Sequence, residues 1–355
     1  MHHVHPDSGA FVIADGKYIW NHNADFPLFL KSMFDVNKQL LDGLEEAKQL
    51  FTAPKHSYTK KLIHDHPYYM HRNESKLISE SELHEKLVEI SHLSYFYPLD
   101  RKRVFQAVKD VSFEIRRDEI FGLVGESGSG KSTVGKCLMG ILNPEAETFS
   151  YDGINLLDKK AKKKNARRLQ KERQMIFQDS TSSLNQKMKV EKILAEPLEI
   201  HKVFSDKKEQ HDFLCEMMEE VELQEEQLHV WPPELSGGQG QRVAIARAFA
   251  MKPKLLIADE PIASLDVTTQ AQMVKLFRHL QREHDCAILF IAHDLSMVRL
   301  LCDRVGVMKD GKLVEIGETE QVFEHPQHLY TKKLLEAIPI PEISGEEQSD
   351  EETMA

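Results

Sequence analysis

The chain has 355 residues, of which 41% are hydrophobic and 29% charged, a composition typical of a globular protein that excludes wholesale disorder. Its 46 basic and 57 acidic residues give a net charge of −11, which argues against a nucleic-acid-binding surface over the whole molecule. The longest central apolar run covers residues 286–292 and is too short to cross a bilayer, which needs about 20 residues in a helix.

The cysteines and the first residues of the chain indicate its compartment. Cys137, Cys215, Cys286 and Cys302 are widely spaced and form no CxxC pair, a pattern that favours a reducing environment. Residues 1–7 lack the basic and apolar segments of a secretion signal. We therefore expect a soluble cytoplasmic protein without an integral membrane span.

Residues 1–85 differ in composition from the rest of the chain. Ten of the 18 histidines lie at or before His92, with local clusters at 2–5 and 64–66 that could bind zinc or nickel. We favour the simpler interpretation, in which these histidines are incidental in a poorly ordered segment.

From residue 87 onward, strands alternate with helices. Period-two alternation or continuous apolar runs predict strands at 87–90, 111–115, 120–124, 255–258 and 287–291, and helices are predicted at 131–142 and 268–284. This alternation indicates an α/β fold with a largely parallel sheet. A helix-rich stretch at 186–230 interrupts it and is predicted to be an inserted subdomain. A basic run at 159–168 is predicted to be a solvated helix face or loop rather than an anion site.

An internal repeat relates the two ends of the chain. Residues 41–67 align without gaps on residues 313–339, and the shared positions include Phe, Pro, His, Tyr, Thr, Lys, Lys and Leu. Two distant copies do not make a solenoid, which needs several adjacent repeats. We interpret the first copy as the remnant-like tail of an upstream domain. Residues 346–355 are acidic and are expected to be disordered.

The sequence after the strand at 120–124 matches the GxxxxGKS pattern of a P-loop and opens the predicted helix. Glycines let the backbone curl so that successive N–H groups point at phosphate oxygens, and the helix N-terminus adds partial positive charge. Lys131 is expected to reach the β- and γ-phosphates, and Ser132 to ligate Mg²⁺. The residues expected to surround the phosphates of ATP are Gly125, Glu126, Ser127, Gly128, Ser129, Gly130, Lys131, Ser132 and Thr133.

An acidic pair follows the apolar strand at 255–258. Phosphoryl transfer to water needs a carboxylate on the metal side and a group that orients the attacking water. Asp259 is expected to hold Mg²⁺ through water at the carboxyl end of the strand, and Glu260 to polarise the attacking water. An isolated Asp-Glu pair could simply be the solvated end of a strand. Because a P-loop lies upstream, we favour a catalytic role for the pair.

The LSGGQ sequence at residues 235–239, taken with the P-loop and the Asp-Glu pair, resembles the ATP-binding domain of ABC proteins over residues 86–340. The resemblance also rests on Gln178, on Asp266 in the sequence Ser-Leu-Asp, and on His293. It implies a P-loop NTPase with a RecA-like core, an antiparallel β subdomain and an inserted helical subdomain at about 181–249.

The resemblance further implies that two such domains pair head to tail around two ATP molecules. Ser236, Gly237, Gly238 and Gln239 would then contact the γ-phosphate bound by the partner, and Asp266 would reach across the dimer. Gln178 would touch Mg²⁺, and His293 would bond the γ-phosphate and steady Glu260. The implied adenine platform is Tyr97, with Phe96 and Tyr95 as rivals.

The tail at 325–341 resembles that of the ATP-binding subunits of dipeptide, oligopeptide and nickel importers. The implied partners are transmembrane permease subunits, a second ABC subunit and, indirectly, an extracytoplasmic solute-binding protein, with no nucleic acid. The chain would then sit peripherally at the cytoplasmic face of the cell membrane. We expect an N-terminal extension at 1–85, an ABC domain at 86–320, an importer-type tail at 321–345 and an acidic end at 346–355.

Some positions depart from the pattern of these importers. Gly240 replaces a basic residue after LSGGQ, and Ile262-Ala-Ser-Leu replaces the more familiar Thr-Ser-Ala-Leu or Val-Ser-Ala-Leu. Other departures replace proline at Ser180, Gln186 and Leu329 and glycine at Asp118 and Glu147. None is a primary catalytic group, but together they raise the alternative of a partly degraded transporter subunit.

A second alternative is a non-transport ABC ATPase acting on nucleic acid or ribosomes. Repair enzymes of this kind carry long coiled coils or zinc-binding CxxC pairs, and ribosomal ones hold two complete ABC domains. This sequence has none of these features. The importer interpretation is therefore the leading one.

Overall fold

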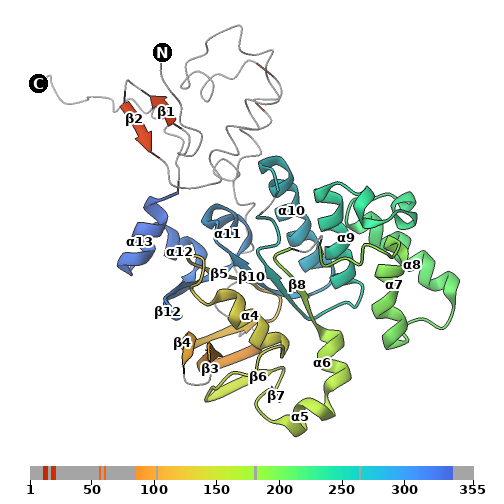
Figure 1. Cartoon of the computed structure of the whole chain (residues 1–355), viewed down its shortest axis with the longest axis horizontal. Helices are drawn as coiled ribbons and strands as arrows, with labels where there is room; N and C mark the ends of the chain where they lie inside the picture. The colour runs from red at the N-terminus through yellow and green to blue at the C-terminus, as the bar shows by residue number, and fades with distance from the viewer. Residues whose placement is uncertain are drawn as a thin grey trace, which may run out of the picture. The chain divides into compact units, whose positions relative to one another are not determined.

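The computed structural model describes residues 11–14, 17–20, 56, 60, 85–100, 103–179, 182–263 and 265–338 (Figure 1). The chain forms two compact units, one of residues 71–265 and 269–336, the other of residues 1–70, 266–268 and 337–355. In the second unit, β1 (Phe11–Ala14) pairs antiparallel with β2 (Lys17–Trp20). The N-terminal histidine clusters, the first repeat copy and the acidic end lie outside the described residues, His56 and Lys60 excepted, so their interpretation stays a prediction.

A six-stranded sheet forms the centre of the larger unit, in the order β12-β11-β5-β10-β9-β8. Its strands are β5 (Ile120–Val124), β8 (Arg173–Ile176), β9 (Leu255–Asp259), β10 (Ala287–Ala292), β11 (Arg304–Lys309) and β12 (Lys312–Glu318). All neighbours run parallel except β12, which is antiparallel to β11. Every residue of β5, β9 and β10 is buried, because parallel strands are covered on both faces, and the three predicted buried strands are confirmed.

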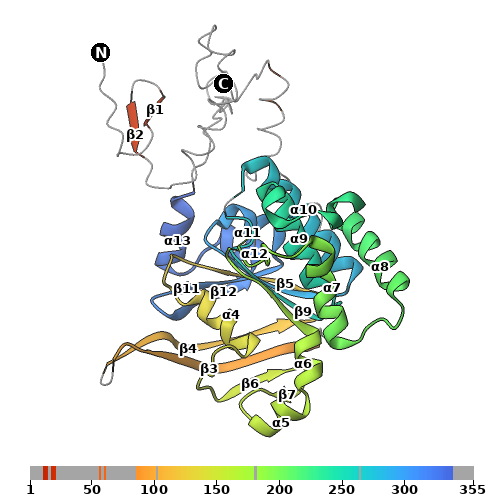
Figure 2. The ribbon, with the colours of Figure 1, turned by 45° about the vertical axis from the view of Figure 1, so that its right-hand side comes forward.

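A second, antiparallel sheet has the order β4-β3-β6-β7. Its strands are β3 (Lys86–Pro98), β4 (Val104–Arg116), β6 (Thr148–Tyr151) and β7 (Ile154–Asn155). Figure 2 shows α4 (Lys131–Met139) between this sheet and the six-stranded sheet. The core joins the two sheets directly as well, since the ring of Phe113 on β4 stacks on that of Phe121 on β5 with centroids 5.1 Å apart.

Helices fill the chain between β8 and β9, which confirms the predicted helix-rich insertion. These are α7 (Val190–His201), α8 (Lys207–Glu220) and α9 (Gly237–Phe249), with the 3-10 turns η1 (Glu225–His229) and η2 (Pro232–Glu234). The remaining helices are α5 (Lys159–Lys164), α6 (Ala166–Glu172), α10 (Val267–Glu283), α11 (Leu295–Leu301), α12 (Thr319–Glu324) and α13 (Leu329–Glu336). Figure 1 shows α7 and α8 projecting to one side of the central sheet.

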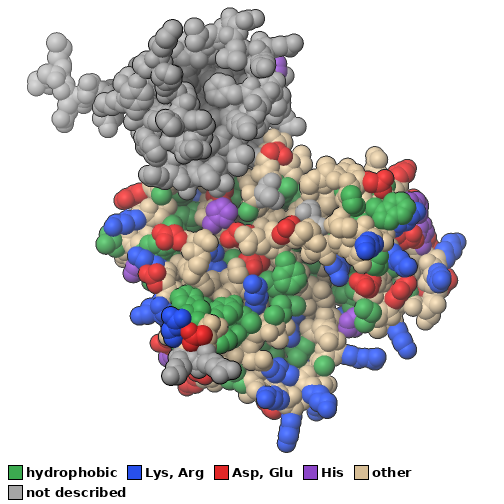
Figure 3. Space-filling model, in the orientation of Figure 1, with side chains coloured by type: hydrophobic (Ala, Val, Ile, Leu, Met, Phe, Trp, Pro, Cys, Tyr) green, Lys and Arg blue, Asp and Glu red, His purple; other side chains and the backbone are tan. Residues whose placement is uncertain are grey.

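The basic run at 159–168 forms α5 and the start of α6. None of the residues of α5 is buried, and Asp158 caps the helix by accepting a hydrogen bond from the Lys160 N–H. Lys and Arg side chains stand out at the lower end of the face in Figure 3, where Figure 1 draws α5. The prediction of a solvated helix face is therefore confirmed.

The described part of the chain contains no helix with both the length and the apolar character needed to cross a membrane.

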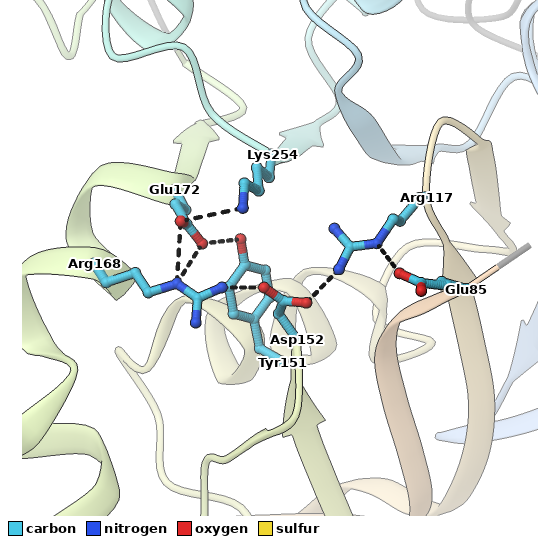
Figure 4. A network of polar contacts seen from close by, with 7 residues as sticks. All are labelled: Glu85, Arg117, Tyr151, Asp152, Arg168, Glu172 and Lys254. Atoms are coloured by element: carbon cyan, nitrogen blue, oxygen red, sulfur yellow. Dashed lines mark hydrogen bonds and ion pairs between the residues drawn. The ribbon is translucent and has the colours of Figure 1, made fainter.

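A polar network ties the antiparallel sheet to the helical side of the larger unit (Figure 4). Asp152, in the turn between β6 and β7, accepts from the guanidinium groups of both Arg117 and Arg168. Arg168 also reaches Glu172 at 3.1 Å, and the Tyr151 hydroxyl donates to Glu172 at 3.1 Å. Burial alone would raise the pKa of Asp152, but the two arginines hold it below its ordinary value.

We expect Asp152→Asn to destabilise the protein by about 1 to 2 kcal/mol near neutral pH, because two arginines lose their charged acceptor. A lowered pKa in the folded state stabilises above the unfolded pKa, and this stabilisation is lost as pH falls through the folded pKa. The difference in unfolding free energy between wild type and variant should therefore shrink with acidification. Urea unfolding in a pH series measures it, with Glu199→Gln, an exposed position on α7, as control. A difference independent of pH would contradict this account.

Candidate active site

The P-loop connects β5 to α4, and its glycines are required by backbone geometry. Gly125 has a φ of 143°, and a Cβ there would lie 2.1 Å from the carbonyl oxygen of Met308. Gly130 has a φ of 104°, and a Cβ there would lie 2.5 Å from the carbonyl oxygen of Ala107. Any side chain at either position would force the backbone apart, so the loop can hold this curl only with glycine.

Lys131 opens α4 and turns back over the loop. Its ammonium group donates to the carbonyl oxygens of Gly125 at 2.7 Å and Glu126 at 2.9 Å, and only 4% of the residue is exposed. Burial lowers the pKa of Lys131, while Glu260, Asp259 and Glu126 oppose that shift. Ser129 and Thr133 are buried beside it, whereas Glu126, Ser127 and Gly128 are exposed.

Ser132 and Asp259 meet at the carboxyl end of β9. The Ser132 hydroxyl donates to Asp259 Oδ1 at 2.8 Å, and Asp259 is almost fully buried. Burial raises the pKa of Asp259, the Ser132 hydrogen bond lowers it, and the neighbouring Glu260 raises it further. A hydroxyl and a carboxylate in contact are hard oxygen donors of the kind that Mg²⁺ prefers, so these residues fit the metal that the sequence predicts.

Glu260 follows directly and faces two other predicted site residues. The Gln178 amide donates to Glu260 Oε2 at 2.8 Å, and His293 Nδ1 lies 3.7 Å from the same oxygen. The His293 ring, Lys131 and the Gln178 amide together hold the pKa of Glu260 below its ordinary value against the effect of burial. The Glu260 backbone has a φ of 48°, a left-handed conformation that side chains rarely adopt.

Tyr97 on β3 points to the start of α4. Its hydroxyl lies 3.4 Å from Thr133 Oγ1, and its ring meets that of Tyr95 edge-on with centroids 4.9 Å apart. Tyr95 packs against the core, and Phe96 is exposed. Of the three aromatic candidates, Tyr97 is the one whose hydroxyl lies beside Thr133 at the start of the P-loop helix.

The LSGGQ residues form the start of α9. Ser236 Oγ accepts from the Gln239 N–H at 3.3 Å, and Gln239 Oε1 accepts from the Ser236 N–H at 2.9 Å, which makes a reciprocal cap. A Cβ at Gly237 would meet no heavy atom within 4 Å, and Gly238 is half-buried. The described contacts therefore join the P-loop, Asp259, Glu260, Gln178 and His293, while those of Ser236 and Gln239 stay within α9.

Asp266 is exposed and belongs to the smaller unit, so its position relative to these groups is not described. Ser264 and Ser180 lie outside the described residues. Among the departures from the importer pattern, Asp118 has a φ of 58°, which explains why glycine would suit that turn. Gly240 is buried within α9, Gln186 and Glu147 are exposed, and Leu329 begins α13 at 66% exposure.

Tyr330 lies beside the P-loop, a position that no local sequence motif predicts. Its hydroxyl accepts from the Glu126 N–H at 3.1 Å, and Lys309 Nζ lies 4.7 Å from the ring centroid. Glu315 on β12 accepts from the N–H groups of Gln327 at 2.7 Å and His328 at 3.0 Å, which anchors the segment before α13. Two sequence signals cover this position, the Tyr-Thr-Lys-Lys match of the internal repeat and the importer-type tail at 325–341, but neither indicates a contact with the P-loop.

A P-loop between β5 and α4, an acidic pair at the end of β9 and a helical insertion that carries LSGGQ define the ATP-binding cassette class of P-loop ATPases. A model of the family described as "ABC transporter" matches residues 108–263. A second, "Oligopeptide/dipeptide transporter, C-terminal region", matches residues 314–353.

Characterised proteins and solved structures of the same class are similar to this chain. The oligopeptide transport ATP-binding protein OppF of Streptococcus mutans is 44% identical over 268 residues, which cover 76% of this chain and 86% of that protein. OppF of Bacillus subtilis is 47% identical over 258 residues, which cover 73% of this chain and 84% of that protein. The dimeric ATP-binding cassette MJ0796, solved in a post-hydrolysis state with ADP and Pi, superposes with a TM-score of 0.59 at 26% identity, covering 65% of this chain and 98% of that chain.

The chain therefore belongs to the family of ABC transporter ATP-binding subunits of the oligopeptide and dipeptide type. The predicted fold class, a P-loop NTPase core with an antiparallel β subdomain and a helical insertion, is confirmed.

We expect Tyr330→Phe to raise the KM for ATP about two- to fivefold with little change in kcat, because one hydrogen bond that positions the P-loop backbone is lost. Phenylalanine keeps the ring beside Lys309, so Tyr330→Ala, which removes both, should have the larger effect. Steady-state ATPase kinetics measure both variants. Identical kinetics of wild type and Tyr330→Phe would show that the hydroxyl does not position the loop.

Proposed function

We propose that this chain is the ATP-hydrolysing, energy-coupling subunit of an importer for oligopeptides or dipeptides. The observation that carries this proposal is the pair of carboxylates beside the P-loop. Asp259 accepts a hydrogen bond from Ser132. Glu260 accepts one from Gln178 and lies next to His293. The reaction is the hydrolysis of ATP by water to ADP and phosphate.

Each group has a role that its geometry supports. Ser132 and Asp259 would hold Mg²⁺, which neutralises charge on the phosphate oxygens when bound. Glu260 stays ionised at neutral pH because its pKa is lowered, so it can accept a hydrogen bond from the attacking water and orient it. His293 would steady Glu260, and the Gln178 amide donates to the same carboxylate oxygen. Lys131 would exchange its carbonyl partners for the phosphates, and Tyr97 would stack on adenine.

Two chains would enclose ATP head to tail. The N–H groups at the start of α9 can bind an anion, and Gly237 leaves them uncovered. In this proposal Ser236, Gly237, Gly238 and Gln239 contact the γ-phosphate held by the partner P-loop, and Asp266 reaches across the dimer. The dimeric state of MJ0796 with ADP and Pi supports such pairing.

Peptide import is supported by the tail and by the relatives. The C-terminal region of oligopeptide and dipeptide transporters matches this chain, and its OppF relatives are oligopeptide transport proteins. Permease subunits, and a solute-binding protein acting through them, are the proposed partners, at the cytoplasmic face of the membrane. The exposed Phe177 and Trp231, near Gln178 and the helical insertion in sequence, would face a permease helix.

We expect Glu260→Gln to retain ATP binding and to reduce ATP hydrolysis at least about a hundredfold, because the water loses its ionised acceptor. Phosphate release and binding of a fluorescent ATP analogue measure the two effects, with Glu199→Gln as the matched control. Undiminished hydrolysis in Glu260→Gln would refute the role of Glu260. A wild-type chain that binds ATP but hydrolyses none with its permease would support the partly degraded alternative.

A mixing experiment tests the head-to-tail arrangement for pairs formed by two copies of this chain; with a related ABC subunit as partner, the two substitutions are divided between this chain and that subunit. Lys131→Ala disables the P-loop and Ser236→Arg blocks the start of α9, so each variant alone should be inactive. Their mixture should recover about a quarter of wild-type activity, because half of the randomly paired dimers are mixed and each of these has one intact site. If Ser236 acted on the ATP of its own chain, mixing would restore nothing.

A further inference from the structure

A cluster of metal-binding side chains lies in the helical insertion, in residues to which the proposed ATP hydrolysis gives no role. His211 and Cys215 stand four residues apart on α8, and so on one face of that helix, while Glu225 begins η1. One ligand atom from each of the three lies within 4.8 Å of the others. Imidazole, thiolate and carboxylate are all zinc ligands.

The two distances from His211 Nε2 to the other ligand atoms are close to those of a tetrahedral metal site. His211 Nε2 lies 3.7 Å from Cys215 Sγ and 3.8 Å from Glu225 Oε1. Zinc bonds of about 2.0 to 2.3 Å meeting at a tetrahedral angle separate neighbouring ligand atoms by about 3.4 to 3.6 Å. All three ligand atoms lie within 4.8 Å of one another, so a common ion would draw them slightly closer, and water would complete the tetrahedron.

Glu191 on α7 orients the imidazole from the opposite side. Its Oε1 lies 3.1 Å from His211 Nδ1, so the nitrogen facing Cys215 and Glu225 is Nε2. A carboxylate bound to the far nitrogen of a metal-binding histidine fixes the tautomer that leaves the other nitrogen free to bind the ion. This second contact distinguishes the cluster from three side chains that merely lie close together.

We propose that His211, Cys215 and Glu225 bind a Zn²⁺ ion, with Glu191 as the positioning residue for His211. The Cys215 thiol loses its proton to solvent as the Zn–S bond forms. The ion links α8 to η1, and η1 leads through η2 to the LSGGQ start of α9. Zn²⁺ would thereby brace the segment that sets the position of Ser236.

Cobalt gives a selective test in the full-length protein. Co²⁺ replaces Zn²⁺ in such sites, and a bound thiolate adds a charge-transfer absorption in the near ultraviolet. The other three cysteines, Cys137, Cys286 and Cys302, are buried, so this absorption reports Cys215. Histidines elsewhere in the chain, including the N-terminal clusters, can bind cobalt but cannot produce a thiolate band.

We expect the wild type to show this band and Zn²⁺ to abolish it by displacement. Cys215→Ser should lose the band, and both His211→Gln and Glu191→Gln should weaken Co²⁺ affinity at least about tenfold. His279→Gln, at an exposed histidine of α10, is the matched control and should behave as wild type. Zn²⁺ should also raise the Tm of the wild type and not that of Cys215→Ser.

The proposal is overturned if saturating Co²⁺ gives no thiolate band in the wild type, or if the band survives Cys215→Ser. It is equally overturned if His211→Gln and His279→Gln bind Co²⁺ alike. Cys215 and His211 are partly exposed, and circular dichroism with ATP binding checks that each variant is folded. Should Cys215→Ser fail this check, the comparison of His211→Gln with His279→Gln decides the matter.

Discussion

The curl of the P-loop against the backbone of two other strands is the constraint on which the rest of the site depends. Gly125 lies against the Met308 carbonyl of β11, and Gly130 against the Ala107 carbonyl of β4. The Gly311 N–H, in the turn after β11, donates to the Ser129 carbonyl at 3.1 Å. The loop therefore takes its shape only when both sheets are in place, and the site is a product of the whole larger unit.

Side chains then reach the loop from distant parts of the chain. Asp259 and Glu260 arrive at the end of a buried strand parallel to β10, which carries His293 just beyond its own end. The same sheet edge thus delivers the acidic pair and the histidine, as parallel strands deliver residues to one side of a sheet. Tyr330 reaches the loop from the C-terminal tail, which is held at β12 by the hydrogen bond from the Gln327 N–H to Glu315. The tail that supplies Tyr330 lies within the region matched by the C-terminal family model of oligopeptide and dipeptide transporters.

The elements that local sequence pattern determines were predicted from the sequence. Continuous apolar runs identified β5, β9 and β10, because strands buried on both faces leave no polar positions. The helix after the P-loop was predicted to reach residue 142 but ends at Met139, because Gly140 adopts a φ of 77° and caps it. The strand predicted at 87–90 extends to Pro98, through register shifts against β4 that alternation does not reveal.

Within the site, contacts between residues far apart in the sequence could not be predicted. The P-loop and the acidic pair are local motifs, so their chemistry was predicted from residue type and spacing. The Glu126–Tyr330 contact joins positions 204 residues apart, and nothing in either local sequence specifies it. The His211–Cys215 spacing is local, but Glu191 and Glu225 come from other elements and acquire meaning only when α7, α8 and η1 are packed together. Roles across a dimer depend on a second chain and remain predictions.

The left-handed backbone conformation of Glu260 costs folding stability at a residue that the proposed ATP hydrolysis requires. Non-glycine residues in that conformation are strained by about 1 to 3 kcal/mol. Its N–H donates to the Ile291 carbonyl at 2.9 Å, which helps to hold the strained geometry. Glycine at this position would relax the backbone and at the same time delete the carboxylate. A substitution that stabilises the backbone here would thus remove the side chain that we propose to polarise the attacking water, and selection for turnover would oppose it.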